Sequence, residues 1–435
     1  MELMRKQGYK ETEVGLIPED WDINYLGKLV LHTKGFAFKS TDYTDDGIRI
    51  IRVSDTLFDR IINKTPVYIS NKKKHEFEKW RLYKNDLILS TVGSKPPMYD
   101  SMVGNVVRVT EEHVGSLLNQ NAVLFRAKED STQIFLYYAL KRENYISHIE
   151  KIYRGNANQA SITLVDLFEY SIPIPPTLTE QKAIATALSD VDELISSLEQ
   201  LITKKKAIKQ GAMQQLLTPP HKGGKRLDGF SGEWRKISIG NLTRNIIDYR
   251  GVTPRKLGMD WGDGEIVALS AGNVKKGFID YSSECYFGSE SLYKRWMRNG
   301  DVEKDDIVFT LEAPLGNIAL IPDNRKYILS QRTILLQLEK DKYESSFIFQ
   351  VLISNTFQNY ISKSATGSTA QGIKRTTFEK LIISVPENIE EQKAIAQILS
   401  DMDAEIEQLE TKKAKCQSIK QGMMQELLTG KTRLV

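Results

Sequence analysis

Cysteine and histidine are scarce in this chain. Its 435 residues include two cysteines, Cys285 and Cys416, and five histidines, and none of them has neighbours at a metal-ligand spacing. The sequence therefore predicts neither a disulfide framework nor a zinc site. We expect a protein of the reducing cytoplasm that binds no metal ion of its own.

Long apolar runs are also absent. No stretch approaches the roughly 18 apolar residues of a membrane-spanning helix. The polar start, MELMRKQGYKETEVG, lacks the apolar core of a secretory signal. We therefore expect a cytoplasmic protein without membrane contact. The formal net charge of +4 is compatible with nucleic-acid binding but does not demand it.

Catalytic motifs are a third absence. DNA amino-methyltransferases need an Asn/Asp/Ser-Pro-Pro-aromatic motif, but the nearest segment, Lys95–Met98, has lysine and methionine at its ends. A Phe-x-Gly-x-Gly cofactor loop is missing, because residues 230–232 lack the second glycine. Residues 430–432 resemble the end of a phosphate-binding loop, but Gln425 stands where its first glycine belongs. We predict no catalytic residue. A stand-alone DNA methyltransferase or nuclease and a coiled-coil adaptor stay open as alternatives.

What the chain does contain is a long internal repeat. Residue 177 aligns with residue 388 and residue 218 with residue 429, a constant offset of 211 without a gap. Both copies space apolar residues alternately by four and three, the heptad pattern of helices that pack side by side. The helix-pairing residues predicted from this pattern are Ile184, Leu188, Val191, Ile195, Leu198, Ile202, Ile395, Leu399, Met402, Ile406 and Leu409.

Both copies have helix start and stop signals. Thr177 and Asn388 stand at N-cap positions three residues before a glutamate, and proline or glycine follows each copy. Each helix is then about 39 residues, or ~58 Å, long. A hairpin within one core is the alternative to spacers between two domains. Gly211 and Gly422 interrupt the helices at a cost of ~1 kcal/mol each, and we expect a close backbone approach there.

The segments before the two helices resemble each other as well. Framework positions recur while loop residues differ: 104–106 matches 316–318, and 144–147 matches 359–362. We predict an α+β fold in which two similar α/β domains are held apart by two long antiparallel helices, with a pseudo-two-fold internal repeat. The predicted layout is a first domain, a central helix, a linker, a second domain and a distal helix with its tail, at 1–176, 177–218, 219–232, 233–387 and 388–435.

Several motifs occur in a fixed order along the chain. They are Tyr9–Trp21, Phe230–Trp234, the proline-to-helix junctions at 172–184 and 385–395, and the helix tails Ile208–Gly211 and Ile419–Gly422. In their order and duplication they resemble the full-length specificity subunits of type I restriction-modification systems. The resemblance covers essentially the whole chain.

The resemblance implies a non-catalytic subunit with two target recognition domains, each recognising one half of a bipartite site in double-stranded DNA. It also implies that the helices set the spacer and dock two subunits of an adenine methyltransferase, and that two translocase-nuclease subunits join for cleavage. No cofactor is expected in this subunit, because S-adenosylmethionine, ATP and Mg belong to the partner subunits. The target sequence does not follow from the resemblance.

Sequence recognition needs side chains that offer paired donors or acceptors to base edges, and cations for phosphates. Such side chains gather in predicted loops and strand ends, where a turn or capping role is the alternative for each. In the first domain the candidate DNA-binding residues are Lys34, Arg52, Ser54, Ser94, Lys95, Asn119, Gln120, Asn121, Arg154, Asn156, Asn158 and Gln159. In the second domain they are Arg250, Thr253, Arg255, Ser270, Asn273, Lys275, Lys276, Glu312, Gln331, Arg332, Thr366, Ser368, Gln371, Lys374 and Arg375.

Overall fold

The chain divides into two compact units. The computed structural model describes residues 8–96, 98–156, 159–251, 253–262, 264–283, 285–330, 332–367 and 371–434. The first unit comprises Met1–Leu198 with Lys412–Val435, and the second comprises Glu199–Thr411. Each long helix therefore contributes to both units. The five-segment layout stays a prediction.

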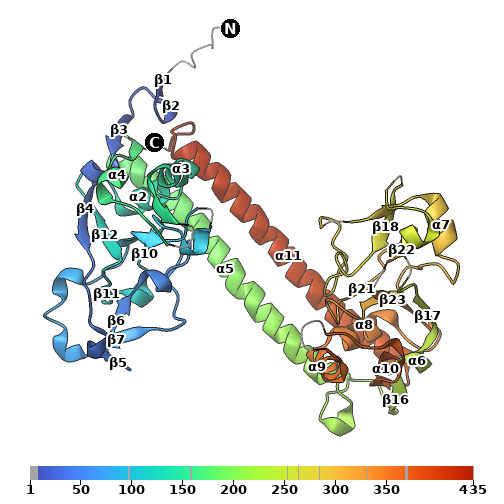
Figure 1. Cartoon of the computed structure of the whole chain (residues 1–435). Coiled ribbons are helices and arrows are strands. Elements are labelled where there is room, and N and C mark those ends of the chain that lie inside the picture. Colours follow the sequence, from blue (N-terminus) through green and yellow to red (C-terminus); the bar gives the residue numbers. More distant parts are fainter. Residues whose placement is uncertain are drawn as a thin grey trace, which may run out of the picture. The chain divides into compact units, whose positions relative to one another are not determined.

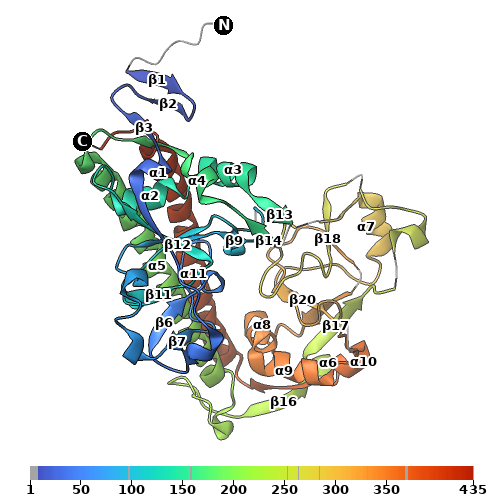
Figure 2. The ribbon, with the colours of Figure 1, turned by 60° about the vertical axis from the view of Figure 1, so that its left-hand side comes forward.

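The first unit is built on an antiparallel sheet in the order β10-β8-β12-β4, of which Figure 1 labels β10, β12 and β4. Its strands are β10 (Val106–Arg108), β8 (Leu87–Ser90), β12 (Ala122–Ala127) and β4 (Val30–Lys34). A second sheet consists of β11 (Leu117–Leu118), β6 (Ile48–Ile51), β7 (Val67–Ile69) and β5 (Tyr43–Thr44). The smaller sheets are β1 (Tyr9–Thr12) with β2 (Gly15–Pro18), β3 (Asp22–Tyr25) with β15 (Ser171–Ile174), and β9 (Val92–Gly93) with β14 (Gln159–Ser161) and β13 (Arg154–Asn156). Figure 2 shows β9, β13 and β14 beside one another.

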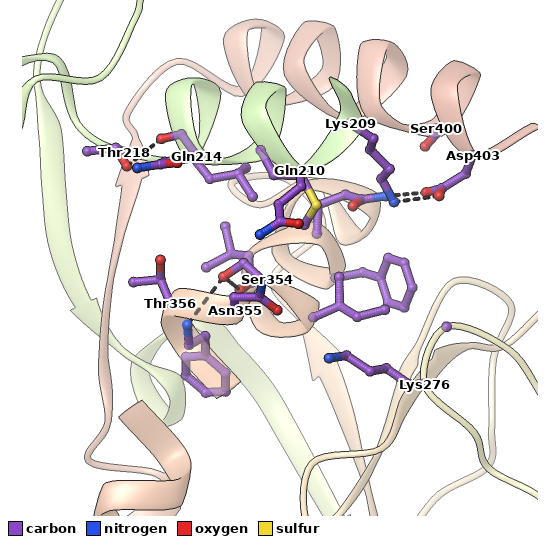
Figure 3. A pocket seen from close by; sticks show the side chains of 18 of the residues that line it. Lys209, Gln210, Gln214, Thr218, Lys276, Ser354, Asn355, Thr356, Ser400 and Asp403 are labelled. Carbon is purple, nitrogen blue, oxygen red and sulfur yellow. Dashed lines mark hydrogen bonds and ion pairs between the residues drawn. The ribbon is translucent and has the colours of Figure 1, made fainter. Parts of the chain in front are cut away.

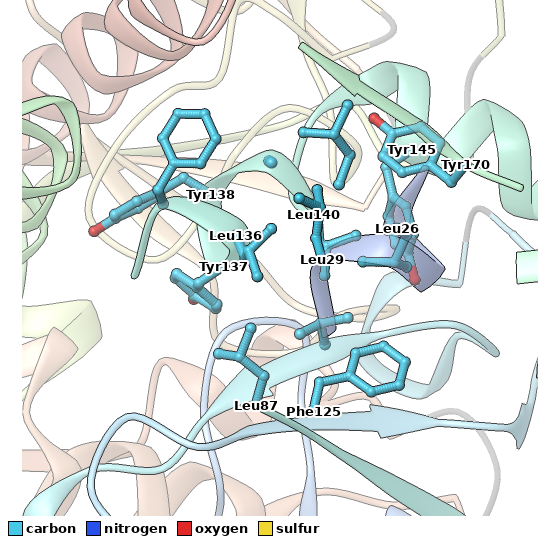
Figure 4. Packing of buried hydrophobic residues seen from close by; sticks show 14 of the residues in the cluster. Leu26, Leu29, Leu87, Phe125, Leu136, Tyr137, Tyr138, Leu140, Tyr145 and Tyr170 are labelled. Atoms are coloured by element: carbon cyan, nitrogen blue, oxygen red, sulfur yellow. The ribbon is translucent and has the colours of Figure 1, made fainter. Parts of the chain in front are cut away.

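Strand β8 and most of β12 are buried on both faces, which explains why these inner strands are largely apolar, whereas the edge strand β4 is mostly exposed. Leu87 and Leu89 of β8 join a core shared with the helices, whereas Ile88 between them joins a separate core on the opposite face. Figure 4 shows Leu87 and Phe125 of the sheet near Leu136 of a covering helix. The short helices of this unit are α1 (Leu26–Leu29), α2 (Gln133–Ala139), α3 (Glu143–Ile152) and α4 (Leu164–Phe168).

The second unit has a central antiparallel sheet in the order β17-β23-β20-β21. Its strands are β17 (Thr243–Asp248), β23 (Thr333–Leu338), β20 (Ile307–Thr310) and β21 (Ile318–Leu320). The other strands are β16 (Trp234–Ser238) with β24 (Ile382–Pro386), and β19 (Phe287–Gly288) with β18 (Ile266–Leu269) and β22 (Tyr327–Leu329). The short helices are α6 (Ile239–Leu242), α7 (Glu290–Trp296), α8 (Ser345–Ile353), α9 (Asn355–Ser364) and α10 (Arg375–Phe378).

The two units repeat one topology, so the predicted duplication is confirmed. The sheet β21-β20-β23-β17 repeats β10-β8-β12-β4, and the parallel pair β18 and β22 repeats the parallel pair β6 and β11. The match extends to single turns. Asn85 and Asp305 have left-handed φ values of 68° and 67°. Each precedes a buried aspartate, Asp86 or Asp306, that accepts a backbone N–H at 2.8 or 3.0 Å.

One predicted match between the units is wrong. Residues 144–147 and 359–362 have similar sequences, but α3 begins at Glu143 whereas α9 begins at Asn355. Tyr145 is buried and its hydroxyl donates to the carbonyl oxygen of Gly104, whereas Tyr360 is 39% exposed. The similarity is therefore displaced by about one helical turn from the structural repeat.

The long helices are α5 (Leu178–Leu216) and α11 (Ile389–Leu427), and both have the predicted length, 39 residues. Their starts are capped as expected. The hydroxyl of Thr177 accepts the N–H of Glu180 at 3.2 Å, and the side chain of Asn388 accepts the N–H of Glu390 at 2.9 Å. Each such cap satisfies a backbone donor that has no partner within the helix.

Within each unit the two long helices pack together and run antiparallel. In the second unit Lys205 pairs with Glu405 at 2.6 Å and Lys209 with Asp403, so the numbering falls along α11 as it rises along α5. Every predicted helix-pairing residue is buried or half-buried. Ile184 and Leu188 lie in the first unit's core with Leu427, and Ile395 and Leu399 lie in the second unit's core with Leu216. The predicted fold class, two α/β domains with two long packed helices, is confirmed.

The expected close approach at the helix glycines is wrong. A methyl group added to Gly211 or to Gly422 would meet no atom of another described residue within 4 Å. Packing inside either unit therefore does not require glycine at these two positions.

Replacing Gly211 by alanine should raise the free energy of unfolding by about 1 kcal/mol, because glycine is the costlier residue in an open helix interior. Urea unfolding measures the change. Gly104→Ala is the control and should destabilise, because Gly104 has a φ of 78° and its added methyl group would lie 2.5 Å from Ile149. Equal losses in the two variants would contradict the open-helix explanation.

Candidate nucleic-acid interface

Some of the predicted DNA-binding residues lie at one edge of the central sheet in each unit, whereas others, such as Arg52 and Thr253, lie outside it. Because neighbouring antiparallel strands run in opposite directions, the end of one strand lies beside the start of the next along the same edge of the sheet. In the first unit, β12 pairs Val123 with Lys34 at the end of β4, and Ala122 with Ser90 at the end of β8. The hairpin of β13 and β14 joins this edge through the pairing of Ala160 with Gly93.

The second unit repeats this edge. There β23 pairs Ile334 with Asp248 at the end of β17, and Thr333 with Thr310 at the end of β20. Glu312, just after β20, bridges to Gly372. We call these segments the loop edge of each unit. It consists of 34–36, 90–94, 119–121 and 154–156 with 159–161 in the first unit, and of 248–250, 310–317, 330, 332 and 371–375 in the second.

Backbone hydrogen bonds fix the turn that precedes β12. The N–H of Asn119 donates to the carbonyl oxygen of Ile51 at 3.0 Å, and the N–H of Thr91 donates to that of Asn121 at 3.1 Å. The N–H of Ile162 donates to the carbonyl oxygen of Thr91 at 3.1 Å. Three neighbouring segments therefore hold one turn in place.

The same three bonds recur before β23. The N–H of Ser330 donates to the carbonyl oxygen of Leu269 at 2.9 Å, and the N–H of Leu311 donates to that of Arg332 at 3.0 Å. The N–H of Ile373 donates to the carbonyl oxygen of Leu311 at 3.0 Å. The loop edge thus has one backbone frame in both units, while the side chains on it differ.

Many of the predicted residues have exposed side chains without a polar partner among the described residues. Their side chains make no hydrogen bond or ion pair with another residue that the structure describes, so they are free to meet a ligand. These residues are Lys34, Ser54, Lys95, Asn121, Asn156, Gln159, Lys276, Glu312, Arg332, Thr366, Gln371 and Lys374.

Two predicted arginines are instead held by an adjacent carboxylate. The guanidinium of Arg52 donates to both oxygens of Asp55, at 3.1 and 2.8 Å. That of Arg250 donates to Asp248, at 2.9 and 2.8 Å. These hydrogen bonds raise the pKa of both guanidinium groups. Part of the donor set of each guanidinium is therefore already used within its own unit.

The remaining described candidates contact neighbours in their own loops. Arg154 pairs with Asp166 at 2.9 Å, and Arg375 pairs with Glu379 at 2.6 Å. Ser94, Thr253, Arg255, Ser270 and Lys275 also contact nearby residues. Gln120 is half-buried, and its side-chain oxygen has no partner among the described residues. Asn158, Gln331 and Ser368 lie outside the described residues.

Two asparagines proposed as base contacts are buried, and their burial is incompatible with direct contact in this conformation. Asn273 is 0% exposed. Its amide donates to Ala268 at 2.9 Å, and its side-chain oxygen accepts the N–H of Ser270 at 2.8 Å. Asn119 is 7% exposed and accepts the N–H of Asn121 at 3.4 Å. Both shape turns, a role that short amide side chains favour.

A residue that sequence reasoning missed is Lys141, which follows α2. Its ammonium donates to the carbonyl oxygen of Phe58 and to the side chain of Asn105, the latter at 3.0 Å. It lies 4.1 Å from the centroid of the Phe58 ring. Burial lowers the pKa of Lys141 to about 7, although Asp59 acts in the opposite direction. No local pattern distinguishes this lysine from an exposed one.

Replacing Lys141 by methionine should change the pH dependence of stability. Because the pKa of Lys141 falls from 10.5 to about 7 on folding, the unfolded chain binds a proton that the folded chain has released between these values. The contribution of Lys141 to the stability of the native chain should therefore rise with pH across that window and be flat below it. Urea unfolding at several pH values should show this rise in the native chain and not in Lys141→Met. Lys151→Met, at an exposed site, should keep it. Equal profiles for all three chains would contradict this assignment.

A separate groove lies in the second unit between α5, α8, α9 and α11 (Figure 3). Its volume is about 1370 Å³, and Lys209, Gln350 and Asp403 contribute to its lining. Of the residues predicted to bind DNA, Lys276 alone belongs to the described lining. The groove is therefore largely distinct from the loop edge.

Two kinds of site are absent from the part of the chain that the structure describes. Its residues include no group of three or more His, Cys, Asp or Glu that could hold a metal ion. None of its helices is both long and apolar enough to cross a membrane.

The chain matches known proteins along most of its sequence. A model of the type I restriction modification DNA specificity domain matches residues 18–210 and again residues 233–417. The chain is 27% identical to the putative type I restriction enzyme MjaX specificity subunit of Methanocaldococcus jannaschii over 441 residues, which cover 100% of this chain and 99% of that one. It is 26% identical to the type I restriction enzyme EcoBI specificity subunit of Escherichia coli over 406 residues, which cover 87% and 78%.

Solved structures show the same fold. The crystal structure of the type I restriction-modification system S subunit from M. genitalium matches with a TM-score of 0.60 at 16% identity, and covers 98% of both chains. A chain from a study of complex assembly and conformational transition in a type I restriction-modification system matches with a TM-score of 0.54 at 14% identity. It covers 96% of this chain and 99% of that one.

Proposed function

Because this chain belongs to the type I restriction-modification DNA specificity family, we propose that the loop edge of each unit recognises one half of a bipartite DNA site. Members of the family are non-catalytic specificity subunits that act on DNA within a type I restriction-modification complex. They carry no cofactor, since cofactors belong to the partner subunits. The alternative of a stand-alone methyltransferase or nuclease is therefore not retained.

The observation that supports two half-sites is a shared frame with different side chains. The turn before β12 and the turn before β23 are held by the same three backbone hydrogen bonds. The exposed residues on them differ, with Asn121 in the first unit and Arg332 in the second. Equal frames with unequal base-contacting groups suit the recognition of two different short sequences.

The long helices complete the proposal. We propose that α5 and α11 set the spacer between the half-sites and dock two methyltransferase subunits, with two translocase-nuclease subunits joining for cleavage. In support, the helices have the same length, 39 residues, and keep their repeat without a gap. A repeated protein surface suits two copies of one partner.

Exchange of one domain tests the independence of the half-sites. Replacing residues 22–170 with the corresponding segment of a relative should change one half of the methylated DNA motif and leave the other unchanged, because the two loop edges share no residue. Mapping methylated bases across a genome measures the motif. The reciprocal exchange of residues 235–381 should change the other half. If either exchange altered both halves, recognition by the two domains would be coupled.

Lengthening one helix tests the spacer. Four residues inserted between Leu198 and Glu199 add ~6 Å and a rotation of ~40°, a length of at most about two base pairs of B-DNA at ~3.4 Å each. We expect the same half-sites with a spacer longer by about one or two base pairs. The control is an insertion of equal length after Gly229, in a linker turn where an added methyl group would meet no atom within 4 Å. Full activity with an unchanged spacer in the helix variant would show that the helices do not set the distance.

A further inference from the structure

We infer that the residue immediately before β12 in the first unit, and before β23 in the second, determines one base pair of each half-site. Asn121 would select adenine and Arg332 guanine. This inference rests on the proposed function, because it assigns a role within the DNA-binding loop edge. Asn121 precedes β12 and Arg332 precedes β23, and these strands hold the same interior place in the two central sheets. The two residues therefore hold equivalent positions in the two sheets, although Arg332 has a left-handed φ and Asn121 does not.

The backbone of both residues is anchored. The carbonyl oxygen of Asn121 accepts the N–H and the hydroxyl of Thr91, at 3.1 and 2.9 Å. The carbonyl oxygen of Arg332 accepts the N–H of Leu311 at 3.0 Å. The strand residue that follows each of them is fully buried. An anchored backbone places a side chain reproducibly and reduces the freedom lost on binding. Recognition of a base edge requires such placement.

Both side chains are also uncommitted. Each is exposed and makes no hydrogen bond or ion pair with a described residue. The other arginines described on the second loop edge differ, because Arg250 is bound to Asp248 and Arg375 to Glu379. Arg332 therefore presents its guanidinium donors without first having to break an ion pair.

The backbone conformation of Arg332 does not favour arginine. Its φ is 67°, a left-handed value that glycine and asparagine adopt more readily than a long side chain does. Nothing in the frame thus explains an arginine at this position. A role of its exposed guanidinium in binding DNA does.

The chemistry of the two side chains assigns the bases. A guanidinium has only donors, and two of them match the paired acceptors O6 and N7 of guanine in the major groove. A carboxamide has one donor group and one acceptor, which match N7 and the N6 amino group of adenine. One position occupied by arginine in one unit and by asparagine in the other therefore specifies two different base pairs.

The test uses the full chain assembled with its methyltransferase subunits and carrying Arg332→Asn, Arg332→Gly or Arg332→Lys. Asparagine and glycine both suit the left-handed backbone, so these variants retain the fold. Methylated motifs are mapped across a genome, and affinity is measured for each base at each half-site position. Arg332→Asn should change one position of the second half-site from guanine to adenine. Arg332→Gly should lose roughly 5- to 150-fold of discrimination at that position alone, and Arg332→Lys should keep guanine with weaker discrimination.

Lys374→Ala is the matched control, because Lys374 is another exposed cation on the same loop edge. It should weaken all sequences alike and lower the salt slope of binding by about one unit. If Arg332→Gly behaved like this control, Arg332 would contact phosphate and the inference would be overturned. An unchanged motif with unchanged affinity would overturn it as well, while the domain exchange would decide the proposed function separately.

Asn121→Ala gives an independent measurement in the first unit. One position of the first half-site should change from adenine to any base, with the second half-site unaffected. Retention of adenine at every position of that half-site would overturn the assignment of Asn121.

Discussion

Both units depend on an ion pair between a buried glutamate at the start of one long helix and an arginine beyond the end of the other. Glu180 and Glu391 are 1% and 0% exposed, and a carboxylate removed from water needs a cation and hydrogen bonds. Arg433 meets that need for Glu180 at 2.8 Å, and Arg226 meets it for Glu391 at 2.9 Å. Hydrogen bonds to these carboxylates raise the pKa of both guanidinium groups. Each arginine follows one long helix and each glutamate opens the other, so the pair ties the start of one helix to the segment beyond the other. In the first unit Arg433 also binds Asp20 at 2.8 Å, which fixes the N-terminal segment to the same point.

A second repeated junction fixes the helices against the domains. Asp192 accepts the hydroxyl of Tyr138 on α2 at 2.7 Å and pairs with Lys420 of α11 at 2.6 Å. Asp403 likewise accepts the amide of Gln350 on α8 at 3.0 Å and pairs with a lysine of α5, a contact drawn in Figure 3. One carboxylate therefore joins three elements in each unit, which sets the rotation of the long helices relative to the domain beside them. This junction gives the heptad pattern its register, since apolar contacts alone tolerate sliding.

The frame was predictable from the sequence because it rests on patterns that extend over many residues. Helix length, pairing faces and duplication all follow from a repeat without a gap. The parts that failed depend on contacts between residues distant in the chain. Asn119 and Asn273 have the composition of base-contacting residues but are buried in turns, and Lys141 has the surroundings of an exposed lysine. Neither the sequence nor the packing within the unit explains why position 211 is a glycine. The likeness of 430–432 to a phosphate-binding loop now has a structural explanation, because this tight turn delivers the arginine that follows it to a buried carboxylate.

The two frames share their backbone hydrogen bonds but differ even in buried side chains. Asp86 of the first unit receives the guanidinium of Arg126, at 2.8 and 2.7 Å. Its counterpart Asp306 accepts the amide of Gln337 at 2.9 Å and the N–H of Glu303 at 3.0 Å, and burial raises the pKa of that carboxyl. One buried acid thus pairs with a cation and the other accepts hydrogen bonds from neutral donors, yet the strand that follows keeps the same pairing in both units. The geometry is therefore maintained by backbone hydrogen bonds, which do not depend on side-chain identity. A frame held in this way leaves the residues on its loop edge free to diverge, and such freedom is what the proposed recognition of two different half-sites would require.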